Sequence, residues 1–253
     1  SLYDENADIL DSVASYVDEQ GYDITAKLQD KENWGASAYS ILNEFLEKKG
    51  VSLKVKDIQG LGFWFVPKCI LELQIIQNAI NEIENSDVRD YFMVAFSEVT
   101  RLVSNRRNGE FKMYRMQPEK VKTYNPDVKK VFLDTLWANV EKMKSLKERV
   151  AGIDLGKVVL SFDDSKILSK VPDDSVDLVI TSPPYGDSRT TVAYGQFSRV
   201  SLQWCDFDSF SYKQIIDIDK TLMGGTQYKK GFENSLCSPV LRKALEEVCE
   251  TEE

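Results

Sequence analysis

The feature that most constrains the fold of this chain is a change in hydrophobic pattern near residue 150. Before that point, apolar residues recur at intervals of three and four, which is the spacing of one buried helix face. After it, residues 157–162 (KVVLSF) and 176–180 (VDLVI) form short, mostly apolar runs. Such runs are typical of parallel strands that are buried on both faces. The sequence therefore predicts an α/β fold with a large helical region.

Residues 1–150 are predicted to form a mainly helical region, an insertion or accessory part of the protein. Residues 51–66 are rich in β-branched and aromatic residues, which predicts a short strand and a loop. Helical spacing, together with turn and capping residues at the segment ends, predicts helices over 36–49, 68–84, 88–104 and 127–149.

Residues 151–253 are predicted to form the α/β segment. The two apolar runs, joined by a short helix over 165–169, would make a strand–helix–strand unit. Thr181-Ser182-Pro183-Pro184-Tyr185 follows the second run directly. Because open α/β sheets bind ligands beyond the carboxyl ends of their strands, this peptide lies where a functional site is expected.

The composition excludes several kinds of chemistry. The 253 residues include no histidine, which removes the commonest general base, the usual serine and cysteine triads and most transition-metal sites. The four cysteines show no CxxC spacing, so neither a zinc site nor a disulfide framework is indicated. No apolar run approaches the roughly 18 residues of a membrane helix. We expect no metal, no membrane contact and a cytoplasmic location.

Charge is distributed unevenly along the chain. The net charge of −9 argues against a protein that coats nucleic acid without specificity. Residues 1–34 hold nine acids against two lysines, whereas residues 101–130 hold nine Lys and Arg against three acids. A protein that contacts DNA at one face could have this distribution, and so could proteins that never contact DNA.

The Ser-Pro-Pro-Tyr peptide suits the methylation of an exocyclic amino group. The amino group of cytosine or adenine is a poor nucleophile because its lone pair is delocalised into the ring. Two hydrogen-bond acceptors close together favour a pyramidal nitrogen, and the Ser182 hydroxyl and the Pro183 carbonyl can supply them. Consecutive prolines fix the backbone. Tyr185 offers a ring on which an extruded base can stack, worth about 1–3 kcal/mol in comparable sites.

Residues 177–185 (DLVITSPPY) resemble the catalytic strand and loop of the N4-cytosine and N6-adenine DNA methyltransferases of restriction–modification systems. The adenine enzymes of that family usually carry Asp where this chain has Ser182, and Ser is typical of the cytosine-N4 enzymes. Residues 164–177, 186–199 and 104–115 are similar to further segments of the family. The resemblance implies a site-specific DNA methyltransferase acting on cytosine N4, with an adenine-N6 enzyme as the alternative.

The resemblance also implies part of a class I, Rossmann-like methyltransferase sheet, S-adenosylmethionine as cofactor, DNA as partner and a cytoplasm of prokaryotic type. The basic positions can instead be a solvated face, and those just after the motif can hold the catalytic loop in place. The implied site residues are Ser182, Pro183, Pro184 and Tyr185 for catalysis, Asp164, Ser165 and Thr181 for the cofactor, and Arg106, Arg107, Lys112, Arg115, Arg189 and Arg199 for DNA.

One feature of the family is missing from the sequence. The family binds its cofactor with a glycine-rich loop after a strand, and residues 152–156 (GIDLG) have glycines but no strand pattern before them. We expect the chain to be an internal part of a longer methyltransferase, working with a second chain that carries the glycine-rich loop. An alternative of another class is a non-catalytic DNA-binding or interaction remnant of such an enzyme.

Overall fold

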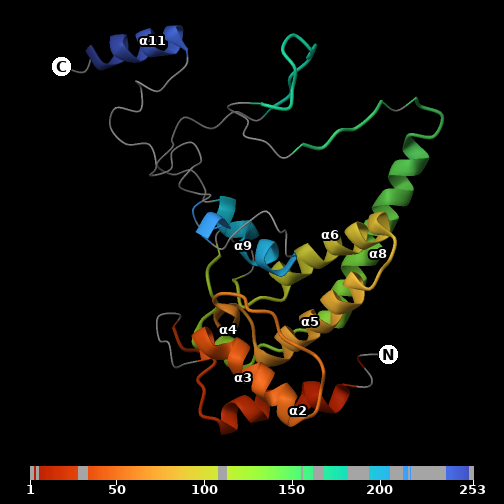
Figure 1. Cartoon of the computed structure of the whole chain (residues 1–253), viewed down its shortest axis with the longest axis vertical. Helices are drawn as coiled ribbons and strands as arrows, with labels where there is room; N and C mark the ends of the chain where they lie inside the picture. Colours follow the sequence, from red (N-terminus) through yellow and green to blue (C-terminus); the bar gives the residue numbers. More distant parts are fainter. Residues whose placement is uncertain are drawn as a thin grey trace.

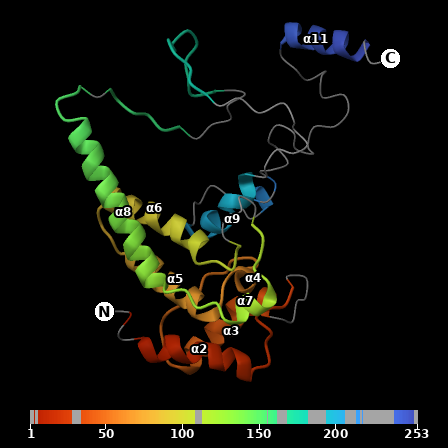
Figure 2. The ribbon, with the colours of Figure 1, turned by 180° about the vertical axis from the view of Figure 1, so that it is seen from behind.

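A computed structural model describes residues 3, 6–27, 34–107, 113–154, 156–161, 168–181, 194–205, 213–215, 217 and 238–250. The first half forms a helical body, and the last of its helices extends beyond it in both Figure 1 and Figure 2. The elements are α2 (Ala7–Glu19), α3 (Trp34–Lys48), α4 (Leu61–Trp64), α5 (Pro67–Asn81), α6 (Ser86–Leu102), α7 (Pro118–Lys122), α8 (Val128–Arg149), α9 (Tyr194–Cys205) and α11 (Pro239–Glu250).

The four helices expected in the first region are confirmed as α3, α5, α6 and α8, with ends that differ by a few residues. Local sequence sets several of these ends. Asn85 caps α6, because its side chain accepts a hydrogen bond from the Val88 N–H at 3.0 Å. Asp127 caps α8 in the same way, accepting from the Lys130 N–H at 2.9 Å. Pro67 occupies the first turn of α5, where its missing N–H has no cost.

Helix α5 is the centre of the helical body. It contacts α2, α6 and α8, and its residues 69–71 are fully buried together with Leu73. Burying one such aliphatic side chain contributes about 1.5–3 kcal/mol. A helix that is apolar on most sides is stable only when other helices cover it. The packing of α2, α6 and α8 on α5 therefore holds the body together.

The prediction of a strand within residues 51–66 was wrong. Residues 51–58 belong to no helix or strand, residues 59–60 form a turn, and α4 follows them. The Val55 N–H donates to Asn43 Oδ1 on α3 at 2.9 Å, and the Lys56 N–H donates to Gln74 Oε1 on α5 at 2.9 Å. Helix side chains thus take the place of a neighbouring strand. The β-type composition reflects the burial of side chains such as Val55 rather than a ladder.

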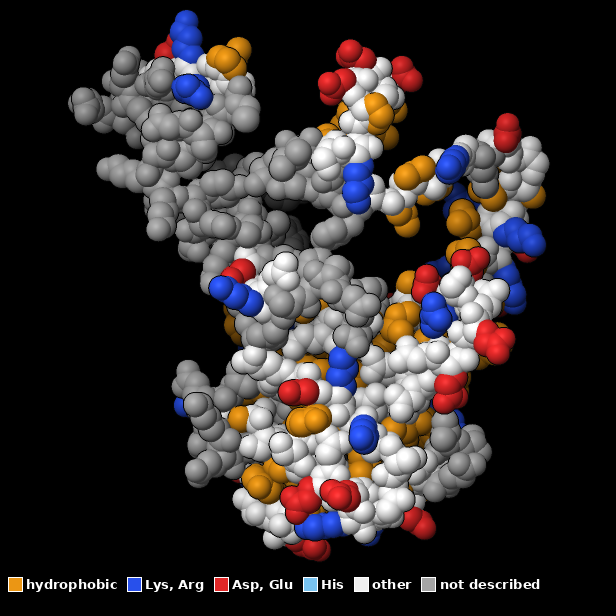
Figure 3. Space-filling model, viewed as in Figure 1, with side chains coloured by type: hydrophobic (Ala, Val, Ile, Leu, Met, Phe, Trp, Pro, Cys, Tyr) orange, Lys and Arg blue, Asp and Glu red, His pale blue; other side chains and the backbone are white. Residues whose placement is uncertain are grey.

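The predicted sheet is not formed by the residues that the structure describes. Residues 156–161 and 168–181 contain no strand, and their apolar side chains are exposed, with Leu160 at 93% and Ile180 at 88%. Figure 3 shows hydrophobic side chains on these segments, away from the helical body. A strand needs neighbours for its N–H and C=O groups. The sheet therefore remains a prediction, as does the division at residue 150, and most of the predicted helix 165–169 lies outside the described residues.

Helix α4 packs closely on α3 at Gly62. A Cβ at this glycine would lie 2.2 Å from the Trp34 carbonyl oxygen and 2.8 Å from the Ala38 Cβ. We expect Gly62→Ala to lower the free energy of unfolding by about 2–3 kcal/mol, because the two helices must separate. Urea denaturation followed by circular dichroism measures this loss.

Gly156→Ala is the control for that substitution, since a Cβ at Gly156 has no atom within 4 Å. It should change the free energy of unfolding by less than about 0.5 kcal/mol. Equal effects of the two substitutions would contradict the packing described for α3 and α4.

Candidate functional site

The structure describes only part of the predicted site. Thr181 is described and exposed, at the end of the segment that leads into the motif. The geometry therefore concerns the helix that follows the motif and four of the six basic residues. The predicted residues that lie outside the described part of the chain are Ser182, Pro183, Pro184, Tyr185, Asp164, Ser165, Lys112 and Arg189.

Helix α9 begins at Tyr194, shortly after the motif, and packs on the helical body. Its Trp204 side chain is fully buried. The indole ring lies edge-on to two rings of the body, with centroids 5.9 Å from Phe65 and 6.1 Å from Phe96. Edge-to-face pairs of this kind add about 0.5–1.5 kcal/mol each beyond the area that they bury.

Polar contacts fix the orientation of α9 on α6. The Ser201 hydroxyl donates to the Ser97 carbonyl at 2.6 Å, and its oxygen lies 3.1 Å from the Thr100 hydroxyl. The Arg101 guanidinium lies 4.3 Å from the centroid of the Phe197 ring. These contacts return the chain to the helical body directly after the motif.

Helix α9 was not predicted from the sequence. The signal for it was the spacing of Phe197, Val200 and Trp204, which is the i, i+3, i+7 pattern of one helix face. Arg199 lies half-buried on this helix, so the structure associates it with the packing of α9. A contact of Arg199 with DNA stays a prediction.

Residues 105–107 and 114–116 of the basic segment after α6 pair in antiparallel fashion, and these two arms are called the hairpin below. Arg106 and Arg115 form an antiparallel bridge. The Arg107 N–H donates to the Tyr114 carbonyl at 2.7 Å, and the Met116 N–H donates to the Asn105 carbonyl at 2.7 Å. The described parts of this segment are therefore fixed relative to α6.

Arg115 has a structural role that the sequence did not indicate. Its guanidinium donates to the carbonyls of Ile24, Thr25 and Ala26 at 2.6–2.9 Å, and it lies 4.4 Å from the centroid of the Phe63 ring. Burial lowers the pKa of Arg115, while nearby Asp23 has a smaller opposite effect. A guanidinium engaged in this way joins the hairpin to the segment after α2 and is not directed at a ligand.

Arg106 is also a scaffold residue. Its side chain is buried, and Nε donates to the Arg101 carbonyl at 2.9 Å. Burial lowers the pKa of Arg106, and the positive charge of Arg101 lowers it further. Arg106 and Arg115 thus both donate hydrogen bonds to protein carbonyls, and a contact of either residue with DNA stays a prediction.

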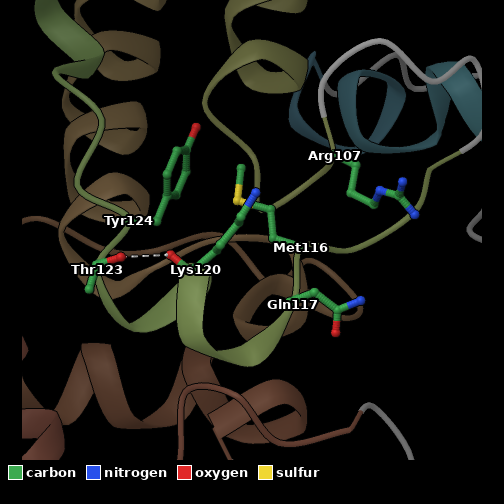
Figure 4. Close-up of a pocket in the computed structure, with 6 residues that line it drawn as sticks. All are labelled: Arg107, Met116, Gln117, Lys120, Thr123 and Tyr124. Atoms are coloured by element: carbon green, nitrogen blue, oxygen red, sulfur yellow. Dashed lines mark hydrogen bonds between the residues drawn. The ribbon is translucent and has the colours of Figure 1, made fainter.

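Arg107 is exposed and lines an open pocket of about 640 Å³ (Figure 4). The pocket lies between the hairpin and α7, and Lys120 extends across it from α7. Burial raises the pKa of Tyr124 to about 12, and its hydroxyl donates to the Leu102 carbonyl at 3.4 Å. The residues that line the pocket are Arg107, Met116, Gln117, Lys120, Thr123 and Tyr124.

Lys120 and Tyr124 were not among the predicted site residues. The excess of Lys and Arg over residues 101–130 was the signal for this surface. The sequence does not show which of these cations face the pocket and which are buried in the helical body, because burial depends on the tertiary fold.

The described ranges of the chain contain neither a side-chain cluster suited to a metal ion nor a helix suited to cross a membrane. No three His, Cys, Asp or Glu side chains in these ranges are grouped so that they could hold a metal ion. None of the helices within them combines the length and the apolar character needed to cross a bilayer. Cys205 is a buried thiol, and burial raises its pKa to about 12, which makes it a poor nucleophile at neutral pH.

Comparison with known proteins gives one informative match. A curated protein of Kocuria varians, the Type II methyltransferase M.MvaI, is 42% identical to this chain over 173 residues. The chain is similar to part of a type II methyltransferase. The match covers 67% of this chain and 38% of the relative, so the chain spans well under half of that protein. No protein-family model matches the chain, and no solved structure matches it.

The packing of α9 on the helical body can be tested by substituting Trp204, with Trp137 as the control position. Trp204→Ala removes a fully buried ring and should lower the free energy of unfolding by about 3–5 kcal/mol. Trp204→Phe should lower it less, because Nε1 of Trp204 has no hydrogen-bond partner to lose. Chemical denaturation measures both losses.

Trp137→Ala is the matched control, because Trp137 on α8 is 61% exposed. It should change the free energy of unfolding by less than about 0.5 kcal/mol. A small effect of Trp204→Ala would mean that α9 does not pack on the helical body.

Proposed function

We propose that this chain is part of a restriction–modification DNA methyltransferase that methylates cytosine at N4. The observation that carries the proposal is the sequence Ser182-Pro183-Pro184-Tyr185 at the end of a β-type apolar run. The 42% identity to a type II methyltransferase supports the same class of enzyme. The serine at the first position of the tetrapeptide favours cytosine N4 over adenine N6.

The proposed roles of the motif follow from the chemistry of the amino group. The target cytosine leaves the duplex and stacks on Tyr185. The Ser182 hydroxyl oxygen and the Pro183 carbonyl accept hydrogen bonds from the two N–H groups, which directs the nitrogen lone pair outward. The nitrogen would then bond to the methyl carbon of S-adenosylmethionine as the methyl–sulfur bond breaks and S-adenosylhomocysteine leaves. The nitrogen would lose its extra proton to solvent, so no histidine is needed. Positioning supplies much of the rate.

S-adenosylmethionine supplies a methyl group on a positively charged sulfur. Asp164, Ser165 and Thr181 are the proposed residues for holding it. Thr181 is exposed, and Gly152, at φ +79°, lies in an exposed turn with open space around it. The described residues therefore do not fit a complete cofactor pocket, and we propose that a second chain or segment contributes the glycine-rich loop.

The proposal also implies a substrate and a location. DNA is the substrate, and a prokaryotic cytoplasm is the proposed location. An adenine-N6 enzyme and a non-catalytic remnant are the competing readings, and product analysis separates all three.

Product analysis tests the function directly. The chain is mixed with duplex DNA, isotope-labelled S-adenosylmethionine and the part of the Kocuria varians relative outside the matched region. The DNA is then digested and its nucleosides identified by mass spectrometry. We expect N4-methylcytosine, and we expect Ser182→Ala to reduce its rate of formation about 100-fold, because one of the two acceptors is lost.

Ser175→Ala is the control, since the hydroxyl of Ser175 donates to the Pro172 carbonyl just before the motif. It should keep nearly full activity. Labelled N6-methyladenine would favour the adenine alternative. No methylated base, or an unchanged rate with Ser182→Ala, would favour the non-catalytic remnant.

A further inference from the structure

We propose that the pocket between the hairpin and α7 binds the DNA backbone, with Arg107 and Lys120 as cationic ligands of separate phosphates. The proposal rests on the proposed function, because it takes DNA as the partner. It concerns a site apart from the catalytic motif.

The charge of the pocket favours an anion. Two of its six lining side chains are cationic and none is acidic. Arg106 interacts electrostatically with the lining residue Tyr124, and its side chain is held by the Arg101 carbonyl. Buried guanidinium groups stay charged in proteins. The pocket therefore combines two exposed cations with positive charge that the fold holds in place.

The size of the pocket suits a stretch of sugar–phosphate backbone. A volume of about 640 Å³ exceeds that of a phosphate and leaves space for the adjoining sugars. Met116 and the half-buried Tyr124 ring provide apolar surface for those sugars. The exposed Gln117 side chain offers a neutral N–H donor beside the two cations. Such combinations of Arg, Lys and amide donors are the usual partners of DNA phosphates.

The scaffold fixes the place from which Arg107 projects. The Arg107 N–H donates to the Tyr114 carbonyl. The neighbouring pair in the hairpin is Arg106 and Arg115, and the side chains of both donate to protein carbonyls. Less conformational freedom is then lost when a ligand binds. Lys120 comes from α7, which begins at Pro118.

The pocket is connected to the motif through α6. Arg107 follows the carboxyl end of α6, and α9, the helix after the motif, packs on that same helix. A DNA backbone held at Arg107 and Lys120 is thus anchored to the element that also holds the chain after the catalytic loop. This connection favours DNA over a free nucleotide or phosphate ion as the ligand.

Fluorescence anisotropy of a short labelled DNA duplex, titrated with the full chain at several salt concentrations, tests the site. We expect Arg107→Gln and Lys120→Gln each to weaken binding about tenfold at low salt. Each should also reduce the slope of log affinity against log salt by about 1, as expected when one phosphate contact is lost. Arg107→Lys, which keeps the charge, should recover most of the affinity.

Lys142→Gln is the matched control, because Lys142 is an exposed cation on α8. It should leave affinity and salt slope nearly unchanged. Equal losses for all three glutamine variants, or absence of DNA binding by the wild-type chain at low salt, would overturn the proposal. Full competition by inorganic phosphate at concentrations that leave the ionic strength constant would assign the pocket to a free anion instead.

Ser182→Ala separates this proposal from the proposed function. DNA binding that depends on Arg107 and Lys120 and is unchanged by Ser182→Ala supports the pocket even if no methylated base is formed. If Lys120→Gln and Arg107→Gln methylate DNA normally and bind it with unchanged affinity, the proposed enzyme activity stands and the proposed phosphate site is wrong.

Discussion

The burial of Trp204 against Phe65 and Phe96 is the contact on which the arrangement of the site depends. It ties α9 to a helical body that is formed a hundred residues earlier in the chain. It acts together with the hydrogen bond from Ser201 to the Ser97 carbonyl and the contact of Arg101 with the Phe197 ring. These contacts hold α9 against the body. The helical region therefore supports the helix that follows the motif in the sequence as well as forming a fold of its own.

The basic hairpin shows how one cluster of charges serves two purposes. Arg106 and Arg107 are adjacent, and successive side chains of an extended segment point to opposite sides. Arg106 is buried and donates to a carbonyl of α6, whereas Arg107 is exposed and lines the pocket. Arg115, opposite Arg106 in the bridge, is bound by three carbonyls. Arg106 and Arg115, bound to protein carbonyls, thus fix the backbone from which the exposed Arg107 side chain projects.

Sequence patterns identified those parts of the fold that depend on local periodicity. The helices α3, α5, α6 and α8 followed from apolar spacing and from caps such as Asn85 and Asp127. The segment 51–60 was misassigned because its backbone is satisfied by Asn43 and Gln74, which lie on other helices and give no local signal. The division of arginines into scaffold and pocket residues could not be predicted for the same reason. The catalytic residues remain sequence predictions, since the structure does not describe them.

The exposed apolar side chains of residues 156–161 and 176–180 are consistent with the limited span of the chain. Val158, Leu160, Leu178 and Ile180 are each at least 74% exposed, which is costly for a folded protein in water. The chain spans 38% of the length of its relative. Strands contributed by the remaining part of such a protein would cover these side chains, as the proposed second chain or segment requires.

Hydrogen–deuterium exchange of the full chain tests most directly whether α9 is an integral part of the helical body. The comparison is between amides of residues 198–205 in α9, of α5 in the core, and of residues 242–247 in α11, whose described side chains are exposed. We expect the α9 amides to exchange slowly, at rates approaching those of α5, because they open only when the body unfolds. Exchange of α9 as fast as that of α11 would contradict the account, since the chain after the motif would then not be held by the body.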